Sequence, residues 1–156
     1  MLQFKRILTP TDFSTPSLEG LRAAIDLAEK FDAELILAHV TDTPAWMALA
    51  YSHPQGVEIP EVMRALREEA VERLSKIQSE NIPGHIRSKL LTEEGPPAEK
   101  IVQLAKAQEA DLIVIATHGY SEFHRFIFGS VTERVVRTAV CPVLTIRPKP
   151  ADKGHK

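Results

Sequence analysis

With 156 residues, the chain has the length of one ordinary domain and can bury a core without disulfides. Hydrophobic residues make up 44%, charged residues 26% and the net charge is −2, which excludes a disordered chain and a polybasic nucleic-acid surface. The N-terminus lacks the apolar core of a signal peptide, no apolar run reaches the roughly 18 residues that span a bilayer, and the single cysteine, Cys141, cannot form an internal disulfide. These features predict a cytoplasmic protein with no membrane or nucleic-acid partner.

The N-terminal half begins with an apolar run, Phe4–Leu8, that predicts a strand covered on both faces. Ser14–Lys30 then carries apolar residues at helical spacing, and Ser and Thr residues at its start can supply an N-cap. A second apolar run, Leu35–Val40, predicts the next strand. Thr43–Ile59 follows without clear periodicity and exceeds the usual length of a connection. It could be a mobile cover, a partner surface, a poorly ordered insertion, or a loop anchored by Trp46 in a groove.

The C-terminal half alternates helices and strands. In chain order, we expect helix Pro60–Glu80, a more polar edge strand His85–Thr92, helix Pro96–Ala107, strand Leu112–Ala116, helix Ser130–Thr138 and strand Val143–Ile146. The alternation predicts right-handed crossovers and an α/β fold, with a doubly wound, five-stranded parallel sheet and helices on both faces. Residues 1–148 would form one domain, and residues 149–156 a frayed tail.

Three polar segments follow the expected strands and should meet at one edge of the sheet. They are Pro10-Thr11-Asp12, His39–Asp42 and Ala116–Thr132. Ligands of doubly wound sheets bind beyond the carboxyl ends of the strands, where the winding direction reverses. Small residues there let a ligand approach the backbone, while the hydroxyls of Ser130 and Thr132 and a helix N-terminus suit phosphate.

Simpler explanations exist for the individual residues of this edge. Taken alone, Gly119 and Gly129 are better explained as a loop turn and a helix start. Asp12 could be only the N-cap of the first helix. His118 and His124 could touch phosphates, but the six histidines lack the spacing of metal ligands. We therefore assign no catalytic residue and no metal ligand.

Other reaction classes lack their signatures in this sequence. There is no glycine-flanked serine elbow of a hydrolase, no Gly-x-x-x-x-Gly-Lys-Ser/Thr loop and no Gly-x-Gly-x-x-Gly after the first strand. A phospho-acceptor receiver domain shares the sheet class, but Asp12 has no neighbouring acidic pair and no lysine ends the last strand. Cys141 precedes Pro142 at the entrance to an apolar strand, which favours a buried structural thiol over a reactive one.

Over about its whole length, the chain resembles the universal stress protein family. ATP-binding members carry Gly-x-x-Gly, nine residues, then Gly-Ser or Gly-Thr; here the match is Ala116-Thr117-His118-Gly119, nine residues and Gly129-Ser130. The stretches ILTPTDFS, LAHVTD, GPPAEKIVQLA, GSVTERVV and CPVLTIRP also look like the family's, in the right order. Two residues depart from the pattern: Ala116 adds a methyl group where the motif has glycine, and Glu122 adds a negative charge that Arg125 could pair.

The resemblance implies a fold of the Rossmann-like, adenine-nucleotide alpha-hydrolase type and an ATP site. In that site Pro10, Thr11 and Asp12 would border the adenosine, Val40 would contact adenine, Ala116, Thr117 and Gly119 would wrap ribose and phosphates, and Gly129, Ser130, Val131 and Thr132 would take the polyphosphate. Mg²⁺ could accompany the phosphates.

The implied function is that of an ATP-binding, nucleotide-sensing regulatory protein of the stress response, acting on a protein partner that the sequence does not identify. The apolar last strand and the resemblance together predict a homodimer through Val143, Leu144 and Thr145. Two alternatives remain. One is a slow ATPase in which Asp12 holds a divalent ion, and the other is a nucleotide-free, dimeric, chaperone-like protein in which Ala116 and Glu122 have abolished binding.

Overall fold

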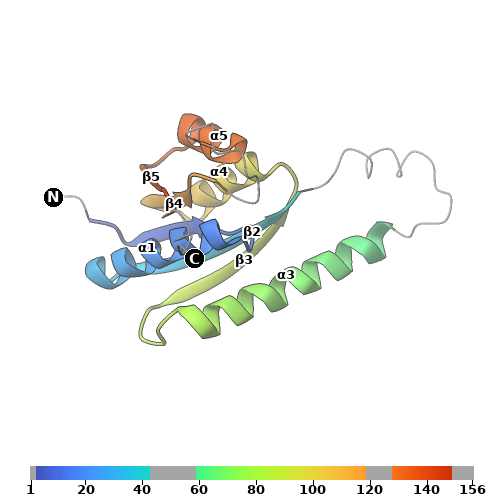
Figure 1. The fold of residues 1–156 in the computed structure, drawn as a ribbon, viewed down its shortest axis with the longest axis horizontal. Helices are drawn as coiled ribbons and strands as arrows, with labels where there is room; N and C mark the ends of the chain where they lie inside the picture. The colour runs from blue at the N-terminus through green and yellow to red at the C-terminus, as the bar shows by residue number, and fades with distance from the viewer. Residues whose placement is uncertain (1–2, 43–58, 119–127, 149–156) are drawn as a thin grey trace, which may run out of the picture.

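The computed structural model describes residues 3–42, 59–118 and 128–148, and its α/β architecture is the expected one (Figure 1). In chain order its elements are β1 (Arg6–Pro10), α1 (Thr15–Phe31), β2 (Glu34–Thr41), α3 (Ile59–Asn81), β3 (Ser88–Glu94), α4 (Pro97–Ala107), β4 (Leu112–Ala116), α5 (Ser130–Thr138) and β5 (Val143–Ile146). No helix in the described ranges is both long enough and apolar enough to cross a membrane.

The five strands form one parallel sheet in the order β3-β2-β1-β4-β5. Strand β1 is central and pairs with β2 on one side, through Ile7 and Leu35, and with β4 on the other, through Ile7 and Leu112. The chain therefore winds outward in one direction through β2 and β3, and in the other through β4 and β5. The reversal lies beside the carboxyl end of β1, which is where a doubly wound sheet binds ligands.

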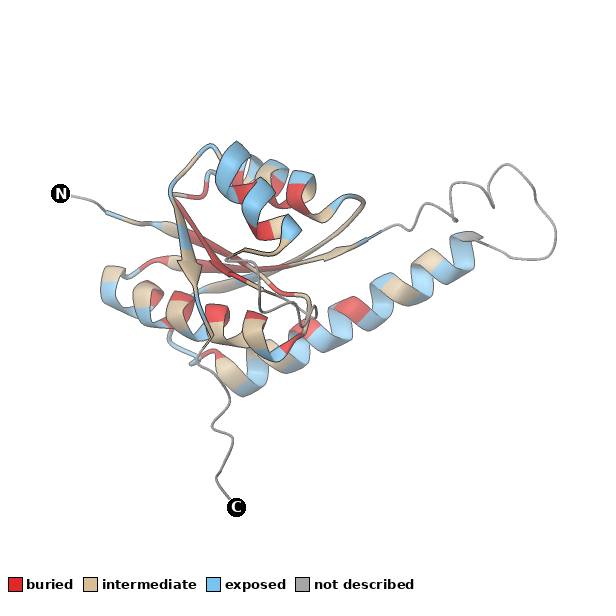
Figure 2. Cartoon of the chain, turned by 45° about the horizontal axis from the view of Figure 1, so that its top comes forward, coloured by how far each residue is buried: buried red, intermediate tan, exposed pale blue. Residues whose placement is uncertain are grey.

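Two apolar layers hold the helices on the sheet, one on each face (Figures 1 and 2). Along β1, Ile7 packs under α1 and α3, whereas Leu8 packs under α4 and α5, and both side chains are fully buried. On the helices, Leu21 of α1 and Leu74 of α3 belong to the first layer, and Ile101 of α4 belongs to the second. Burial on both faces explains why the strands are continuous apolar runs.

The first helix is capped by Ser14, whose side chain accepts a hydrogen bond from Ser17 N. Its other end turns at Asp32, which has φ 50° and donates its backbone N–H to the carbonyls of Ala28 and Glu29. The alternative reading of Asp12 as the N-cap of this helix is therefore wrong, because Ser14 occupies that position.

Most element limits agree with the sequence prediction, but β1 and β3 lie further along the chain than predicted. Strand β1 begins at Arg6 because Phe4 packs edge-on against Phe31, with ring centroids 5.1 Å apart, instead of joining the ladder. Strand β3 begins at Ser88 because the buried Ile86 lies in a turn closed by its N–H on the Pro83 carbonyl. In both places an apolar residue packs against the core without belonging to a strand, Ile86 buried and Phe4 partly buried, and the sequence pattern cannot distinguish such a residue from a strand residue.

Several sequence predictions fall on residues outside the described ranges. These are the roles suggested for residues 43–58, for Gly119, Glu122, His124 and Arg125, and for the tail at 149–156.

Candidate functional site

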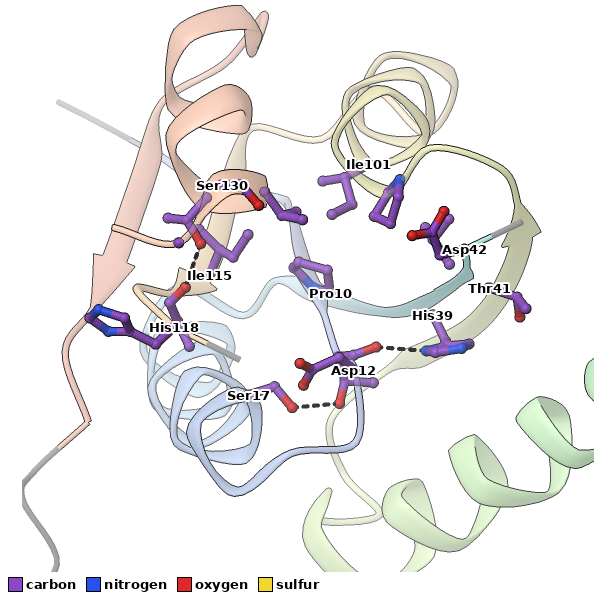
Figure 3. Close-up of a pocket in the computed structure, with 17 residues that line it drawn as sticks. Pro10, Asp12, Ser17, His39, Thr41, Asp42, Ile101, Ile115, His118 and Ser130 are labelled. Carbon is purple, nitrogen blue, oxygen red and sulfur yellow. Dashed lines mark hydrogen bonds between the residues drawn. The ribbon is translucent and has the colours of Figure 1, made fainter. Parts of the chain in front are cut away.

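A cavity of about 430 Å³ lies at the carboxyl edge of the sheet (Figure 3). The ends of β1, β2 and β4 and the starts of α1, α4 and α5 line it, so the three polar segments meet as expected. The predicted site residues found in its lining are Pro10, Thr11, Asp12, Val40, Ala116, Gly129, Ser130, Val131 and Thr132. Thr117 is buried behind this lining, and Gly119 lies outside the described residues.

Four lining residues were not predicted as part of the site: Ser17, Pro97, Ile101 and Ile115. The sequence pattern predicts Pro97 as part of a helix and Ile101 as part of the face of that helix that packs on the core. A signal was nevertheless present, because a helix that follows a parallel strand begins at that strand's carboxyl end. His39, Thr41 and Asp42 also line the cavity; they belong to the predicted convergent segments but had been given no role.

At one end of the cavity, the start of α4 presents apolar surface. Pro96 occupies the N-cap position without a side-chain hydrogen bond, and Pro97 is the first helical residue. Proline has no N–H, so the first amide of this helix is absent. Ile101, one turn further along, and Val40 of β2 extend the apolar lining.

At the other end, the start of α5 presents backbone amides. Gly129 is the N-cap residue in extended conformation, and its own N–H donates to the Thr117 carbonyl at 2.7 Å. The next three N–H groups, those of Ser130, Val131 and Thr132, have no acceptor among the described residues. Unsatisfied first-turn amides and the helix dipole make this end attractive to an anion.

The hydroxyl of Thr132 anchors α5 to the sheet, a role that the sequence did not reveal. Thr132 Oγ1 donates to the carbonyl of Ala116 at 2.8 Å, and Thr132 is 4% exposed. Its proton is therefore not available to a phosphate oxygen, in contrast to the sequence expectation. Ser130 is exposed at the cavity, and its hydroxyl makes no hydrogen bond to another described residue.

Helix α1 approaches Ala116 closely at Gly20, which has no side chain to collide with the Ala116 methyl group. A Cβ atom built on Gly20 would lie 3.2 Å from Ala116 N and 3.8 Å from Ala116 Cβ. In the described ranges the non-glycine residues with positive φ are Phe13, Asp32 and Glu109, so Ala116 does not need the left-handed region. The departure from glycine therefore brings no backbone strain at this position.

The loop between β1 and α1 forms a second wall of the cavity and is held by its own side chains. Asp12 Oδ1 accepts from Ser14 N at 3.0 Å and from Ser14 Oγ, while Oδ2 has no donor among the described residues. Ser17 Oγ donates to the Ser14 carbonyl at 2.8 Å, so Thr11 Oγ1 is the donor in its 2.9 Å bond to Ser17 Oγ. Thr11 thus builds the loop, and Asp12 offers one free carboxylate oxygen beside the cavity.

His39, on β2, closes this wall. Its Nδ1 lies 2.8 Å from the Thr11 carbonyl oxygen, which can only accept, so Nδ1 carries the proton of the neutral ring (Figure 3). Burial lowers the pKa of His39, and the charge of Arg73 lowers it further, while the bond to Thr11 and the charge of Asp12 act in the opposite direction. The neutral ring leaves Nε2 as a hydrogen-bond acceptor.

Phe13 adopts a backbone conformation that is unusual for a bulky residue. Its φ is 67°, in the left-handed region, which costs on the order of 1–3 kcal/mol. The centroid of its ring lies 4.3 Å from the centroid of the His39 ring and 4.0 Å from the guanidinium carbon of Arg73 on α3. Ring contacts of about 0.5–1.5 kcal/mol and cation–π contacts of about 0.5–2 kcal/mol can together offset that cost.

Two further ionisable side chains, His118 and Cys141, lie at or near the site. His118 lines the cavity, and its Nδ1 lies 2.9 Å from Thr117 Oγ1. Cys141 is half-buried on the α4 and α5 side, and burial raises the pKa of its thiol, as expected of a structural cysteine. Within the described ranges, no group of three or more His, Cys, Asp or Glu side chains is placed to hold a metal ion.

Known proteins share this sequence and architecture. Residues 3–147 match the model of the universal stress protein family. Universal stress protein MJ0531 of Methanocaldococcus jannaschii is 38% identical over 146 residues, which cover 92% of this chain and 82% of the relative.

Solved structures agree with this relationship. The structure of MJ0577 from the same organism has a TM-score of 0.81 and 28% identity, covering 96% of this chain and all of the other. The universal stress protein of Archaeoglobus fulgidus in complex with dAMP has a TM-score of 0.56 and 22% identity, covering 93% and 98% of the two chains, and its likeness extends to the fold. The chain therefore belongs to the universal stress protein family.

Proposed function

We propose that this protein binds an adenine nucleotide, with ATP as the first candidate, in the carboxyl-edge cavity. One observation carries the proposal: the cavity has an apolar end at α4 and an end with unsatisfied amides at α5. A nucleotide has the same polarity, with a flat base at one end and anionic phosphates at the other. The volume of about 430 Å³ is in the range of small-molecule sites, which is roughly 300–1,000 Å³.

The lining suggests where each part of the ligand would lie. The base would sit against Val40, Pro97 and Ile101, and the phosphates would take the amides of α5 and the hydroxyl of Ser130. The ribose would lie between them, within reach of Asp12 Oδ2, since a carboxylate at a strand end is suited to a ribose hydroxyl. The fold of a dAMP-binding relative, shared at 22% identity, supports adenine nucleotides as the ligand class.

A Mg²⁺ ion would be held by the ligand as much as by the protein. Mg²⁺ prefers oxygen ligands and is commonly bound by one or two carboxylates together with phosphates. Asp12 fits this requirement because one of its carboxylate oxygens is engaged by Ser14 and the other is outside any bond in the described structure. We propose Asp12 as the protein ligand of an ion that arrives with ATP; with that ion bound, Asp12 Oδ2 contacts the ion in place of the ribose hydroxyl.

We propose that residues 1–148 act as one cytoplasmic, nucleotide-sensing regulatory domain. A ligand regulates by binding one conformation of the protein more tightly than another. The cavity walls come from the ends of three strands and the starts of three helices, α1, α4 and α5, so an occupant would bias all of them together. A protein partner that responds to this bias would complete the regulatory role.

We also propose a homodimer through β5, as predicted from the sequence. β5 is an edge strand that pairs only with β4 in the described sheet. β5 and the segment that precedes it carry apolar side chains that a monomer would leave in water: Leu144 of β5 is 39% exposed, Val136 of α5 46% and Val140 64%. Sedimentation of the protein at micromolar concentration should give a dimer, and Leu144→Pro should dissociate it; a monomeric unsubstituted protein would refute this interface.

The nucleotide proposal is tested by two measurements on the full chain. Denaturing the purified protein should release an adenine nucleotide, identified by chromatography. Isothermal titration of the nucleotide-free protein should show one ATP per chain and weaker binding of adenosine, which lacks the phosphates that α5 would take. Absence of released nucleotide together with absence of ATP binding would contradict the proposed function.

A further inference from the structure

Arg73 contacts a wall of the cavity from a helix that does not itself reach the cavity. No residue of α3 lines the cavity among the described residues, and α1 and α3 both lie on the opposite face of the sheet from α4 and α5. The Arg73 guanidinium carbon nevertheless lies 4.0 Å from the ring centroid of Phe13, and Phe13 lies against His39, which does line the cavity. We call Arg73, Phe13 and His39 the Phe13 cluster.

Buried neighbours in α3 hold the backbone of Arg73 in a fixed position against the core. Ala70 and Leu74, on either side of Arg73 in α3, are 4% and 0% exposed, and Leu74 belongs to the apolar layer under α1 and α3. The guanidinium itself stays partly in solvent, at 45% side-chain exposure, and also pairs with Glu69 at 3.6 Å. Arg73 therefore has a backbone held between buried neighbours and a guanidinium that is partly exposed to solvent.

Phe13 determines the geometry of the loop that carries Asp12. Its N–H donates to Thr11 Oγ1 at 3.0 Å, and the following N–H, that of Ser14, donates to Asp12 Oδ1 at 3.0 Å. The second bond, from Ser14 to Asp12, depends on the left-handed conformation of Phe13, with φ 67°, which a bulky residue adopts only when its surroundings hold it there. Release of the Phe13 ring would let the residue leave that conformation and would turn the Asp12 carboxylate.

We propose that Arg73 is a positioning residue of the cavity, which acts through the Phe13 ring to hold Thr11 and Asp12 in their binding geometry. The consequence for ligand affinity rests on the proposed function, whereas the consequence for the loop does not. The competing explanation is that Arg73 only pairs with Glu69, and an exposed pair of that kind has little effect on anything else.

The chain offers a matched set of variants for this test. Arg73→Met removes the guanidinium but keeps an unbranched side chain, and Arg73→Lys keeps the charge but loses the planar group that stacks best on a ring. Arg64→Met is the control, because Arg64 is on the same helix and pairs with Glu68 at 3.6 Å as Arg73 pairs with Glu69. Glu69→Gln removes the Glu69 pair and leaves the contact with Phe13.

The first measurement needs no ligand. Amide hydrogen exchange at Phe13 and Ser14 reports their bonds to Thr11 Oγ1 and Asp12 Oδ1. Arg73→Met should accelerate exchange at Ser14 by about three- to tenfold, which corresponds to the energy of one cation–π contact; exchange in Arg73→Lys should be intermediate, and exchange in Arg64→Met and Glu69→Gln should be unchanged. Proton NMR should also show a higher pKa of His39 in Arg73→Met, because a positive charge that lowers it is gone. Unchanged exchange at the Ser14 amide would overturn the proposal.

The second measurement is ATP affinity by titration calorimetry, with a thermal melt of each variant to confirm that it is folded. Arg73→Met should bind ATP about three- to tenfold more weakly, and the two controls should match the unsubstituted protein. Faster exchange with unchanged affinity would overturn the positioning role. If Arg73→Met fails to fold, Phe13→Leu, which removes the ring and keeps α3 intact, takes its place with the same two readouts. If the unsubstituted protein does not bind ATP, the proposed function fails and the exchange measurement alone decides the role of Arg73 in the loop.

Discussion

Helices α4 and α5 begin at the same edge of the sheet and cover the same face, yet they present opposite chemistry to one cavity. α4 begins with Pro96 and Pro97 and offers a ring in place of its first N–H, whereas α5 begins with Gly129 and Ser130 and leaves three amides without acceptors in the described structure. The Ala98 and Glu99 amides of α4 also have no acceptor among the described residues, but neither residue lines the cavity. The comparison teaches that the residue at the first helical position determines what a helix start presents to a cavity. The same helix dipole is present in both.

The largest effect is expected from releasing α5 from the sheet. Thr132→Val should lower the free energy of unfolding by about 2 kcal/mol, because the buried carbonyl of Ala116 loses the hydroxyl donor that it has in the described structure. Urea unfolding measures this, and Thr132→Ser, which restores the hydroxyl, should recover most of the loss. A Thr132→Val protein as stable as the unsubstituted one would show that the hydrogen bond does not anchor α5.

The next largest effect is expected from making α5 begin as α4 does. Ser130→Pro removes one N–H and the hydroxyl, while proline is well tolerated at the first helical position and the preceding Gly129, with φ −70° and ψ 161°, already has a conformation that proline accepts. ATP affinity should fall about tenfold, by about 1.4 kcal/mol, the size of a charge-assisted hydrogen bond. Titration calorimetry gives the affinity.

Ser130→Ala is the control for this change, since it removes the hydroxyl and keeps the amide. It should lie between the unsubstituted protein and Ser130→Pro. Equal affinities for Ser130→Pro and the unsubstituted protein would remove α5 from the phosphate site.

A smaller effect is expected from making α4 begin as α5 does. Pro97→Ser replaces apolar lining by an amide and a hydroxyl, and the loss of apolar contact should weaken ATP and adenosine alike by about two- to threefold. Competition binding with both ligands measures this. A gain in affinity confined to ATP would place the phosphates at α4 and reverse the assignment of the two ends.

The smallest effect concerns His39, on the wall away from both helix starts. Its pKa in the folded protein is below the ordinary value of about 6.5, chiefly because of burial, so the unfolded chain binds the proton more tightly. The stability from neutral His39 should be fully present above about pH 6.5 and be lost as the pH falls toward the lowered value.

His39→Asn isolates this contribution, because the amide can donate to the Thr11 carbonyl as Nδ1 does but does not titrate. The difference in unfolding free energy between the two proteins should shrink as the pH falls from 7 to 5. A difference that stays constant over that range would mean that His39 titrates alike in both states.

Much of the scaffold could be predicted from the sequence because local patterns encode it. Strands β4 and β5 and helix α5 have the predicted limits, since each is a short apolar or amphipathic segment with clear boundaries. The convergence of three segments followed from the geometry of parallel sheets. The limits of β1 and β3 were wrong where Phe4 and Ile86 pack against the core without belonging to a strand.

The details of the cavity depend on contacts between residues far apart in the chain. Thr132 donates to Ala116, His39 to Thr11, and Arg73 contacts Phe13 across 60 positions. A local pattern contains no information on such pairs, so the anchoring role of Thr132 and the left-handed Phe13 could not be foreseen. The apolar role of Pro97 could have been, because a proline at a helix start removes an amide from the cavity edge.

The most direct test of the assignment of the two cavity ends is an NMR titration of the full protein, labelled on amides and methyl groups, with ATP and with adenosine. ATP should shift the amides of Ser130, Val131 and Thr132 together with the methyl groups of Val40 and Ile101, whereas adenosine should shift the methyl groups and leave the three amides nearly unchanged. Shifts of the α5 amides by adenosine, or methyl shifts without amide shifts in the presence of ATP, would contradict the placement of the phosphates on α5 and of the base beside α4.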